Sequence, residues 1–107
     1  MFTSEYVGSK VEIYDIGNLD TQAPQLLGAV QSDSTNHSTW TSEDGNYLYS
    51  CRETVDGDLR VYDVHDPSQP LLIKAIKAKD LGLNAISPHN PVVMGNKLYV
   101  SWYQAGL

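Results

Sequence analysis

One pattern constrains the fold of this chain more than any other: a short strand, a proline-containing turn and a second strand, and this pattern occurs twice. In the second copy, Leu-Arg-Val-Tyr-Asp-Val at residues 59–64 alternates so that Leu59 and Val61 share one face. This period of two is the signature of a β-strand. Residues 65–70 contain two prolines, which lack an N–H and fix φ, so they predict a turn. The apolar run at residues 71–76 predicts the returning strand.

The first copy spans residues 11–30 and has the same order of features. Strand-like residues 11–16 and 26–30 enclose a polar stretch that ends in a proline. The Tyr-Asp pair of the first copy stands 48 residues before that of the second, whereas the matching prolines are 46 residues apart. The first turn is therefore two residues longer than the second.

The segments that lie between and after these copies also resemble one another. Residues 36–49 and 88–99 begin near a histidine, His37 in one and His89 in the other, and each carries a Gly-Asn pair between two strand-like runs. Gly-Asn in this setting predicts a tight hairpin turn. The two histidines therefore occupy equivalent places in successive units.

The repeating unit has four antiparallel strands in roughly 45 to 50 residues, which is typical of a β-propeller blade. We predict an all-β propeller segment with about two blades' worth of strands. Residues 1–35, in which a strand ends near residues 5–7, form the second half of one blade plus a linker. Residues 36–84 form a complete blade, with at most one helical turn within 77–85, and residues 85–107 form the first half of the next.

Two blades' worth of strands cannot close a ring of four to eight blades. We therefore expect the chain to be a segment of a longer protein, whose other blades, or another protein, are its partners. Assembly of a ring from several copies is the alternative, but it requires an open sheet edge on each copy.

Composition argues against several classes of partner. The chain has 7 basic and 13 acidic residues, a net charge of −6, whereas binding to nucleic acid or to anionic lipid requires clustered basic residues. No apolar run approaches the about 20 residues of a membrane span, and Met1 is not followed by a signal peptide. Cys51 is the single cysteine, so no intrachain disulfide is expected, and we predict a packed side chain.

Residues 59–73, Leu-Arg-Val-Tyr-Asp-Val-His-Asp-Pro-Ser-Gln-Pro-Leu-Leu-Ile, resemble the LVIVD repeat. That repeat has a Leu-x-Ile/Val-x-Asp strand followed by Asp-Pro-x-x-Pro. Residues 11–30 are a looser match, because Gly-Asn-Leu-Asp replaces a clean Ser-Asp-Pro.

Two further stretches are similar to choice-of-anchor B proteins, and together the matches cover nearly all of residues 10–107. His-Ser-Thr-Trp at residues 37–40, followed by Arg52-Glu53, is similar to a His-Ser-x-Trp…Asp-Glu pattern. Residues 89–107 are similar to His-Asn…Gly-Asn…Tyr-x-x-Gly-Leu. The resemblance implies a bacterial β-propeller located extracellularly, at the cell surface or in the periplasm, and it implies little chemistry.

A more distant likeness is to the selenium-binding-protein propellers of the methanethiol oxidase type, which share a Gly-Asp-Leu-Arg-x-Tyr-Asp strand. Those proteins use His-rich metal sites. The present sequence lacks their adjacent His-His and Cys-rich motifs, so the resemblance does not carry that activity over.

The candidate binding residues lie where equivalent positions of neighbouring blades converge, at the mouth of the central channel. His37 and His89 are candidate ligands for one metal or one anion, and Glu53, after the second strand of its unit, would reach the same rim. The alternative is that each histidine holds a loop by hydrogen bonds to backbone. We predict no catalytic residue and no firm cofactor, with a divalent metal left open. The remaining candidate ligand-binding residues are Asn90, Trp102 and Tyr103.

Other polar and aromatic residues have competing interpretations. We expect Asp15 and Asp63 to accept backbone N–H groups from the turns that follow them. Trp40, with Trp102 and Tyr103, would form a stacking rim for sugar or peptide, although such aromatics more often pack between blades. A weak surface calcium site at Glu53, Asp56 and Asp58 is also open, without the ligand spacing of an EF-hand.

The sequence favours a non-catalytic structural or binding module of an exported or cell-surface protein, which mediates interaction with a protein or a small ligand. The alternative is a metal-dependent oxidase or hydrolase with a His-lined central site. A third possibility is a part of a large assembly with no activity of its own.

Overall fold

The computed structural model of the chain describes residues 1–4, 9–32 and 35–107. The prediction of an all-β chain is confirmed, and the helical turn expected within residues 77–85 is present as the 3₁₀ helix η1. The strand end expected near residues 5–7 lies outside the described residues. The elements are β1 (Phe2–Ser4), β2 (Lys10–Asp15), β3 (Gln25–Gln31), β4 (Asn36–Thr41), β5 (Tyr47–Arg52), β6 (Asp58–Asp63), β7 (Leu71–Lys77), η1 (Ala78–Leu81), β8 (Pro88–Met94) and β9 (Lys97–Trp102).

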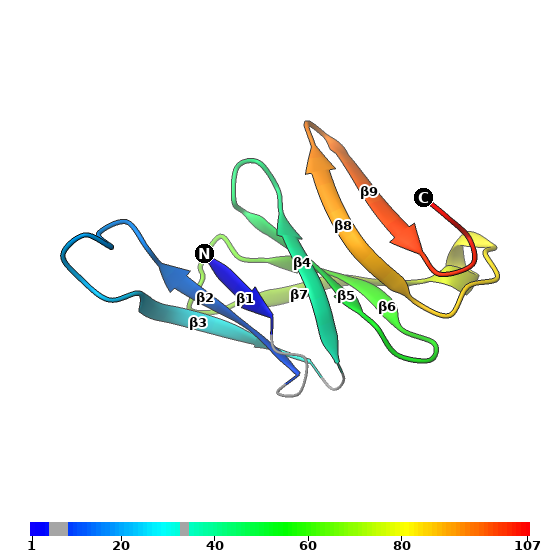
Figure 1. Ribbon diagram of the computed structural model, residues 1–107, viewed down its shortest axis with the longest axis horizontal. Coiled ribbons are helices and arrows are strands. Elements are labelled where there is room, and N and C mark those ends of the chain that lie inside the picture. Colours follow the sequence, from blue (N-terminus) through cyan, green and yellow to red (C-terminus); the bar gives the residue numbers. More distant parts are fainter. Residues whose placement is uncertain (5–8, 33–34) are drawn as a thin grey trace.

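The strands form three antiparallel sheets that lie side by side along the molecule (Figure 1). The first sheet has the order β1-β2-β3, the second β4-β5-β6-β7 and the third β8-β9. Within each sheet, consecutive strands are neighbours, as short hairpin connections require. Across the described ranges the sheets form an open row rather than a closed ring, with principal extents of 48 × 31 × 22 Å.

The two strand pairs that the sequence matched have the same register. Val11 pairs with Val30 in β2–β3, and Leu59 pairs with Ile76 in β6–β7. Each β6 residue stands 48 positions after its β2 counterpart, and each β7 residue 46 positions after its β3 counterpart. Both ladders also shift register at the same place, just before the tyrosine of the Tyr-Asp pair. The two ladders therefore correspond residue by residue, and the longer turn absorbs the difference.

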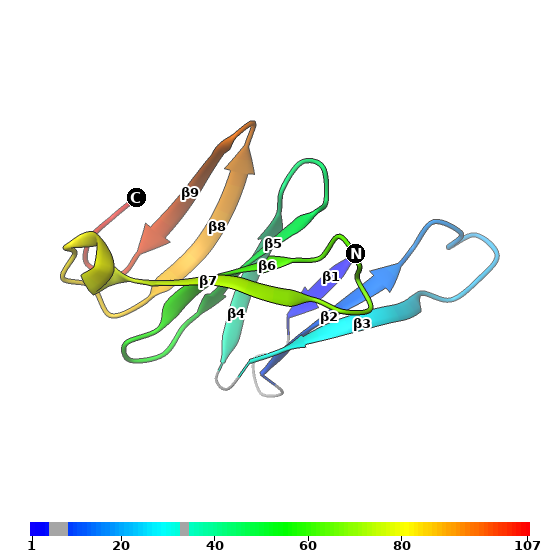
Figure 2. The same cartoon turned by 180° about the vertical axis from the view of Figure 1, so that it is seen from behind.

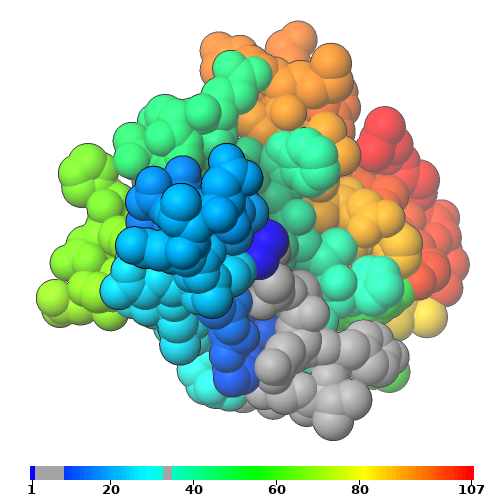
Figure 3. Space-filling model, turned by 60° about the vertical axis from the view of Figure 1, so that its left-hand side comes forward, coloured from blue at the N-terminus to red at the C-terminus, as the bar shows by residue number. Residues whose placement is uncertain are grey.

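The second sheet carries a buried core cluster on each of its faces. The prediction that Leu59 and Tyr62 lie on opposite faces of β6 is confirmed, because each belongs to a different core cluster. The cluster shared with the first sheet contains Val11, Ile13, Val30, Leu48, Tyr62 and Val64. The cluster on the other face contains Cys51, Leu59, Ala78 and Trp102, with Leu98 and Val100 of β9 packed against it. In the space-filling view the first sheet, blue to cyan, lies directly against the green second sheet (Figure 3).

Backbone contact reinforces the junction between the first two sheets. A Cβ atom built on Gly28 of β3 would lie 2.0 Å from the carbonyl oxygen of Pro67, in the turn between β6 and β7. No real side chain tolerates that separation. Glycine at this position therefore lets the β6–β7 turn approach the first sheet closely.

The turns follow the expected chemistry. Gly45 and Gly95 have φ of +75° and +59°, in the hairpins β4–β5 and β8–β9 respectively, which is the backbone region that favours glycine. The predicted roles of Asp15 and Asp63 are confirmed. Asp15 accepts the N–H of Gly17 at 2.8 Å, and Asp63 accepts the N–H of His65 at 2.9 Å.

Strand β7 is the outer strand of the second sheet and crosses the back of the molecule (Figure 2). The apolar run that predicted this strand is present, but its first residues, Leu71, Leu72 and Ile73, are exposed. The strand leads directly into η1, which is capped at its C-terminal end by Gly82 with φ of +70°. In the part of the chain that the structure describes, no helix has the length and apolar character needed to cross a membrane.

Cys51 is fully buried against Leu59, Ala78 and Trp102, as the sequence predicted for a packed residue. Burial raises the pKa of its thiol to about 12. At pH 8 the thiol would therefore stay protonated, and the thiolate is the reactive form. We expect the native chain to resist a thiol-specific disulfide reagent at pH 8 and to react fully in guanidinium chloride. Rapid reaction of the native chain would contradict this placement.

Candidate functional site

Three candidate residues from distant parts of the sequence meet where the second and third sheets adjoin. His37 comes from β4, His89 from β8, and Glu53 follows the last residue of β5. Nδ1 of His37 lies 3.0 Å from Oε2 of Glu53, and Nε2 of His89 lies 3.8 Å from Oε1 of the same carboxylate. One donor atom from each of the three side chains lies within 4.8 Å of the others. We call this group the His-Glu-His cluster.

The aromatic rings of the cluster pack against one another. The ring centroids of His37 and His89 are 4.7 Å apart with an interplanar angle of 33°. Tyr103, just after β9, meets His89 edge to face at 5.4 Å. Its hydroxyl donates a hydrogen bond to Oε1 of Glu53. Two imidazoles and one phenol therefore share a single carboxylate.

Irregular strand pairing coincides with both histidines. In β4–β5 the register shifts between Asn36 and Ser38, so His37 has no opposite residue in the ladder. In β8–β9 the shift falls between Pro88 and Pro91, a stretch that includes His89. Such β-bulges redirect side chains and are common beside functional sites. Here the two bulges stand at equivalent places in neighbouring sheets.

A hydrogen bond across the junction, with one more on each side of it, fixes the strands that carry the cluster. The Ser38 hydroxyl donates to the backbone carbonyl of His89, which ties β4 to β8. The N–H of Glu53 donates to the carbonyl of Thr35 at 3.2 Å, and the N–H of Tyr103 donates to the carbonyl of Ser87 at 3.1 Å. The backbone on both sides of the cluster is thus held by bonds that bridge separate segments.

A buried ion pair braces the loop that carries Glu53. Arg52 and Asp58 stand at the two ends of the β5–β6 loop, and the Arg52 guanidinium makes a two-point contact with the Asp58 carboxylate, through Nε and through Nη2 at 3.1 Å. Nε of Arg60 lies 3.3 Å from the same carboxylate. Both Arg52 and Asp58 are buried. Within the loop, a Cβ on Gly57 would lie 2.0 Å from the Arg52 carbonyl oxygen, so glycine permits this tight closure.

The acidic residues proposed as a calcium site have separate partners instead of converging. Asp58 pairs with Arg52, and Asp56 pairs with Lys77 on β7. Hydrogen bonding to Lys77 lowers the pKa of Asp56 below its ordinary value. Glu53 belongs to the His-Glu-His cluster. The carboxylates of Glu53, Asp56 and Asp58 therefore do not form a common calcium site.

The other candidate binding residues divide between the cluster and the core. Tyr103 joins the cluster, whereas Trp102 is 8% exposed and packs in the core between the second and third sheets. Asn90 is exposed, and its backbone N–H donates to the Ser101 hydroxyl at 3.1 Å. Trp40 is exposed on β4. The structure does not bring Trp40, Trp102 and Tyr103 together as one stacking rim.

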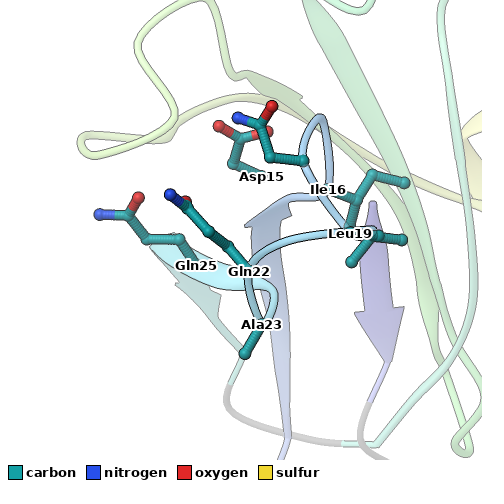
Figure 4. Close-up of a pocket in the computed structure, with 7 residues that line it drawn as sticks. Asp15, Ile16, Leu19, Gln22, Ala23 and Gln25 are labelled. Atoms are coloured by element: carbon teal, nitrogen blue, oxygen red, sulfur yellow. The ribbon is translucent and has the colours of Figure 1, made fainter.

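In the described part of the chain, three hollows lie away from the cluster. In the β2–β3 loop, a depression of about 10 Å³ has room for about one water molecule. Figure 4 shows Gln22 and Gln25 extending to one side of it and Ile16 and Leu19 to the other. A groove between the β4–β5 and β8–β9 hairpins is lined by Tyr47, Tyr49, Val93 and Leu98, among others. The third hollow is apolar and is lined by Leu59, Ile76, Leu98 and Trp102, among others. None of the three is lined by a histidine or a cysteine.

The geometry of the cluster suits the binding of a polar ligand. About a third of each imidazole is exposed, whereas the carboxylate of Glu53 is mostly covered. A ligand arriving from solvent would meet the two rings first, with the negative charge behind them. Imidazole nitrogens bind metals when neutral and anions when protonated, so this arrangement has two possible classes of ligand.

A scan against protein-family models finds no match to the chain, and a search of the curated proteins likewise finds none.

Proposed function

We propose that this chain is part of a β-propeller of the LVIVD-repeat type and serves as a non-catalytic binding module. The complete blade would be residues 36–84, whose four strands pair in the order β4-β5-β6-β7. The first sheet, within residues 1–35, would supply the second half of the preceding blade. The third sheet, within residues 85–107, would supply the first half of the next.

The matched strand registers support this assignment. The β4–β5 and β8–β9 ladders correspond as the β2–β3 and β6–β7 ladders do, since Trp40 pairs with Tyr49 and Val92 pairs with Tyr99. Each face of the second sheet packs over part of its area against a neighbouring sheet. Stacking of sheets on both faces is what a blade requires, because a single blade cannot bury its own faces.

The location that we propose, at the cell surface or otherwise outside the cytoplasm of a bacterium, rests on the LVIVD and choice-of-anchor B resemblance alone. The net charge of −6 is compatible with a freely solvated outer surface. The other blades of the same propeller, or another protein, would be its partners.

One observation carries the binding function: His37, Glu53 and His89 meet at the junction of two sheets although they are far apart in sequence. We propose that a small polar ligand binds there. The bulged strands, the Ser38 bond to the neighbouring sheet and the braced Glu53 loop hold the three side chains before any ligand arrives. Such preorganisation lowers the entropy lost on binding.

A nuclear magnetic resonance titration of the ¹⁵N-labelled chain tests this function. The probes are inorganic phosphate, a methyl glycoside and Zn²⁺, each added alone. We expect at least one probe to cause saturable shifts confined to the amides around His37, Glu53 and His89. Shifts that are scattered over the surface, or absent with all three probes, would contradict a polar ligand site at this cluster.

A metal-dependent oxidase or hydrolase is the second candidate function. The observation that favours it is the combination of two imidazoles and one carboxylate with a solvent-exposed side, because catalytic metal sites keep one position open for water or substrate. The binding module remains the preferred function, since none of the three hollows described above is lined by His37, Glu53 or His89.

A further inference from the structure

The donor set of the His-Glu-His cluster matches one class of metal ion. Two imidazole nitrogens and one carboxylate oxygen are borderline ligands, which suit Zn²⁺ and related first-row transition metals. Ca²⁺ and Mg²⁺ prefer sites made of oxygen atoms alone, and no such group of acidic residues is found among residues 1–4, 9–32 and 35–107. The chemistry of the donors therefore distinguishes transition metals from the hard divalent cations.

The distances within the cluster are close to those of an occupied site. Zn²⁺ with ligands at about 2.0–2.1 Å in a tetrahedral arrangement holds its ligand atoms roughly 3.4 Å apart. The two imidazole contacts to Glu53 measure 3.0 and 3.8 Å, and all three donors lie within 4.8 Å of one another. Side-chain rotations that shorten the longest donor separation by about 1.4 Å would thus bring the three donors to a common ion.

A second layer of contacts orients the carboxylate. The Tyr103 hydroxyl donates to Oε1 of Glu53, and hydrogen bonds of this kind to a metal-binding carboxylate fix its orientation and are important for affinity. The loop that carries Glu53 is closed by the buried Arg52–Asp58 pair. Metal sites need this support, because loosely held ligands lose much of their affinity.

We infer that His37, Glu53 and His89 bind one divalent transition-metal ion, with Zn²⁺ as the matching ion, at the junction of the second and third sheets. This inference rests on the binding function proposed for the same cluster and specifies its ligand. The protein supplies three ligands, and the exposed side of the imidazoles leaves the fourth position to water. Without the ion, the two imidazoles share Glu53, as the contacts show.

Equilibrium dialysis of the full 107-residue chain against Zn²⁺ alone, followed by elemental analysis, tests the inference. We expect one zinc per chain. Both Glu53→Gln and His89→Asn are expected to weaken binding by at least about 100-fold, and Tyr103→Phe, which removes only the orienting bond, by roughly 10-fold. Melting of each variant without zinc verifies that it folds. The absorption spectrum of the Co²⁺-loaded chain reports the coordination geometry independently.

The third histidine provides a matched control. His65 lies in the turn after β6, and its Nδ1 is 3.1 Å from Oδ1 of Asn46. We expect His65→Asn to bind zinc as the parent chain does. Less than stoichiometric zinc in the parent chain, zinc lost with His65 or full affinity in Glu53→Gln would overturn the inference. If the chain does not bind zinc but phosphate or the glycoside shifts the same amides, the proposed binding function stands and only the inference of a metal ligand is wrong. If none of the probes binds at the cluster, the binding function and the metal inference are both wrong.

Discussion

Replacement of Asp58 by alanine is expected to lower the free energy of unfolding by about 3–5 kcal/mol, because it leaves the Arg52 guanidinium buried without its carboxylate. The side chains of Arg52 and Asp58 are only 11% and 5% exposed. Two parallel contacts join them, and Arg60 adds a third. Urea unfolding followed by circular dichroism measures the change directly.

Two further variants separate this ion pair from surface electrostatics. Lys77→Gln breaks the pair with Asp56 on the exposed side of the same sheet, and exposed pairs contribute little to stability. We expect its unfolding midpoint to stay close to that of the parent chain. The double variant Arg52→Met/Asp58→Leu removes both charges of the pair and should recover part of the lost stability, because Arg60 keeps its charge beside the replaced Asp58. An Asp58→Ala chain as stable as the parent would contradict a buried, paired carboxylate.

The strand pairing was predictable because the repeat restricts it so strongly. Offsets of 48 and 46 residues between the copies, visible in the sequence, recur in every residue pair of β2–β3 and β6–β7. A shift of one residue would turn every side chain to the opposite face, so the buried faces fix the register. The assignment of these sheets to propeller blades, in contrast, rests on the LVIVD resemblance and stays a proposal.

The meeting of His37 and His89 was predictable from their equivalent positions, since equivalent positions of stacked units come together. Glu53 was predictable from its place after the second strand. The bulges were not, because bulges arise from local backbone irregularity that the residue pattern around His37 and His89 does not encode. The Ser38 bond to the His89 carbonyl was also missed.

Strand geometry explains why Trp102 and Asp58 lie away from the sites that the sequence suggested for them. Trp102 shares alternation with Leu98 and Val100, so it faces the core with them, whereas Tyr103 follows the strand end and reaches Glu53. The Arg52–Asp58 pair could have been found, since Cys51 pairs with Leu59 and the next residues on each strand are opposite one another. Counting strand pairs from the β5–β6 loop would have placed Asp58 opposite Arg52, as its ion-pair partner and not as a calcium ligand.

Replacement of Leu48 by alanine is the change from which we expect the largest loss in the apolar core, about 2–5 kcal/mol of unfolding free energy. Leu48 is 0% exposed and packs with Val11 and Val30 of the first sheet and Tyr62 of its own. Removal of its branched end loses apolar burial and leaves a cavity that the rigid strands cannot fill. Chemical denaturation monitored by tryptophan fluorescence measures the loss.

Leu71→Ala makes the same chemical change on an exposed strand and therefore isolates burial as the cause. Leu71 is 66% exposed on β7, and surface substitutions of this kind change stability by less than about 1 kcal/mol. Leu48 faces the first sheet, whereas the His-Glu-His cluster lies at the junction with the third, so folded Leu48→Ala chains should retain their zinc stoichiometry. Equal destabilisation by the two leucine variants would contradict the packing of the first sheet on the second. Loss of zinc from folded Leu48→Ala chains would instead show that the two junctions are coupled through the second sheet.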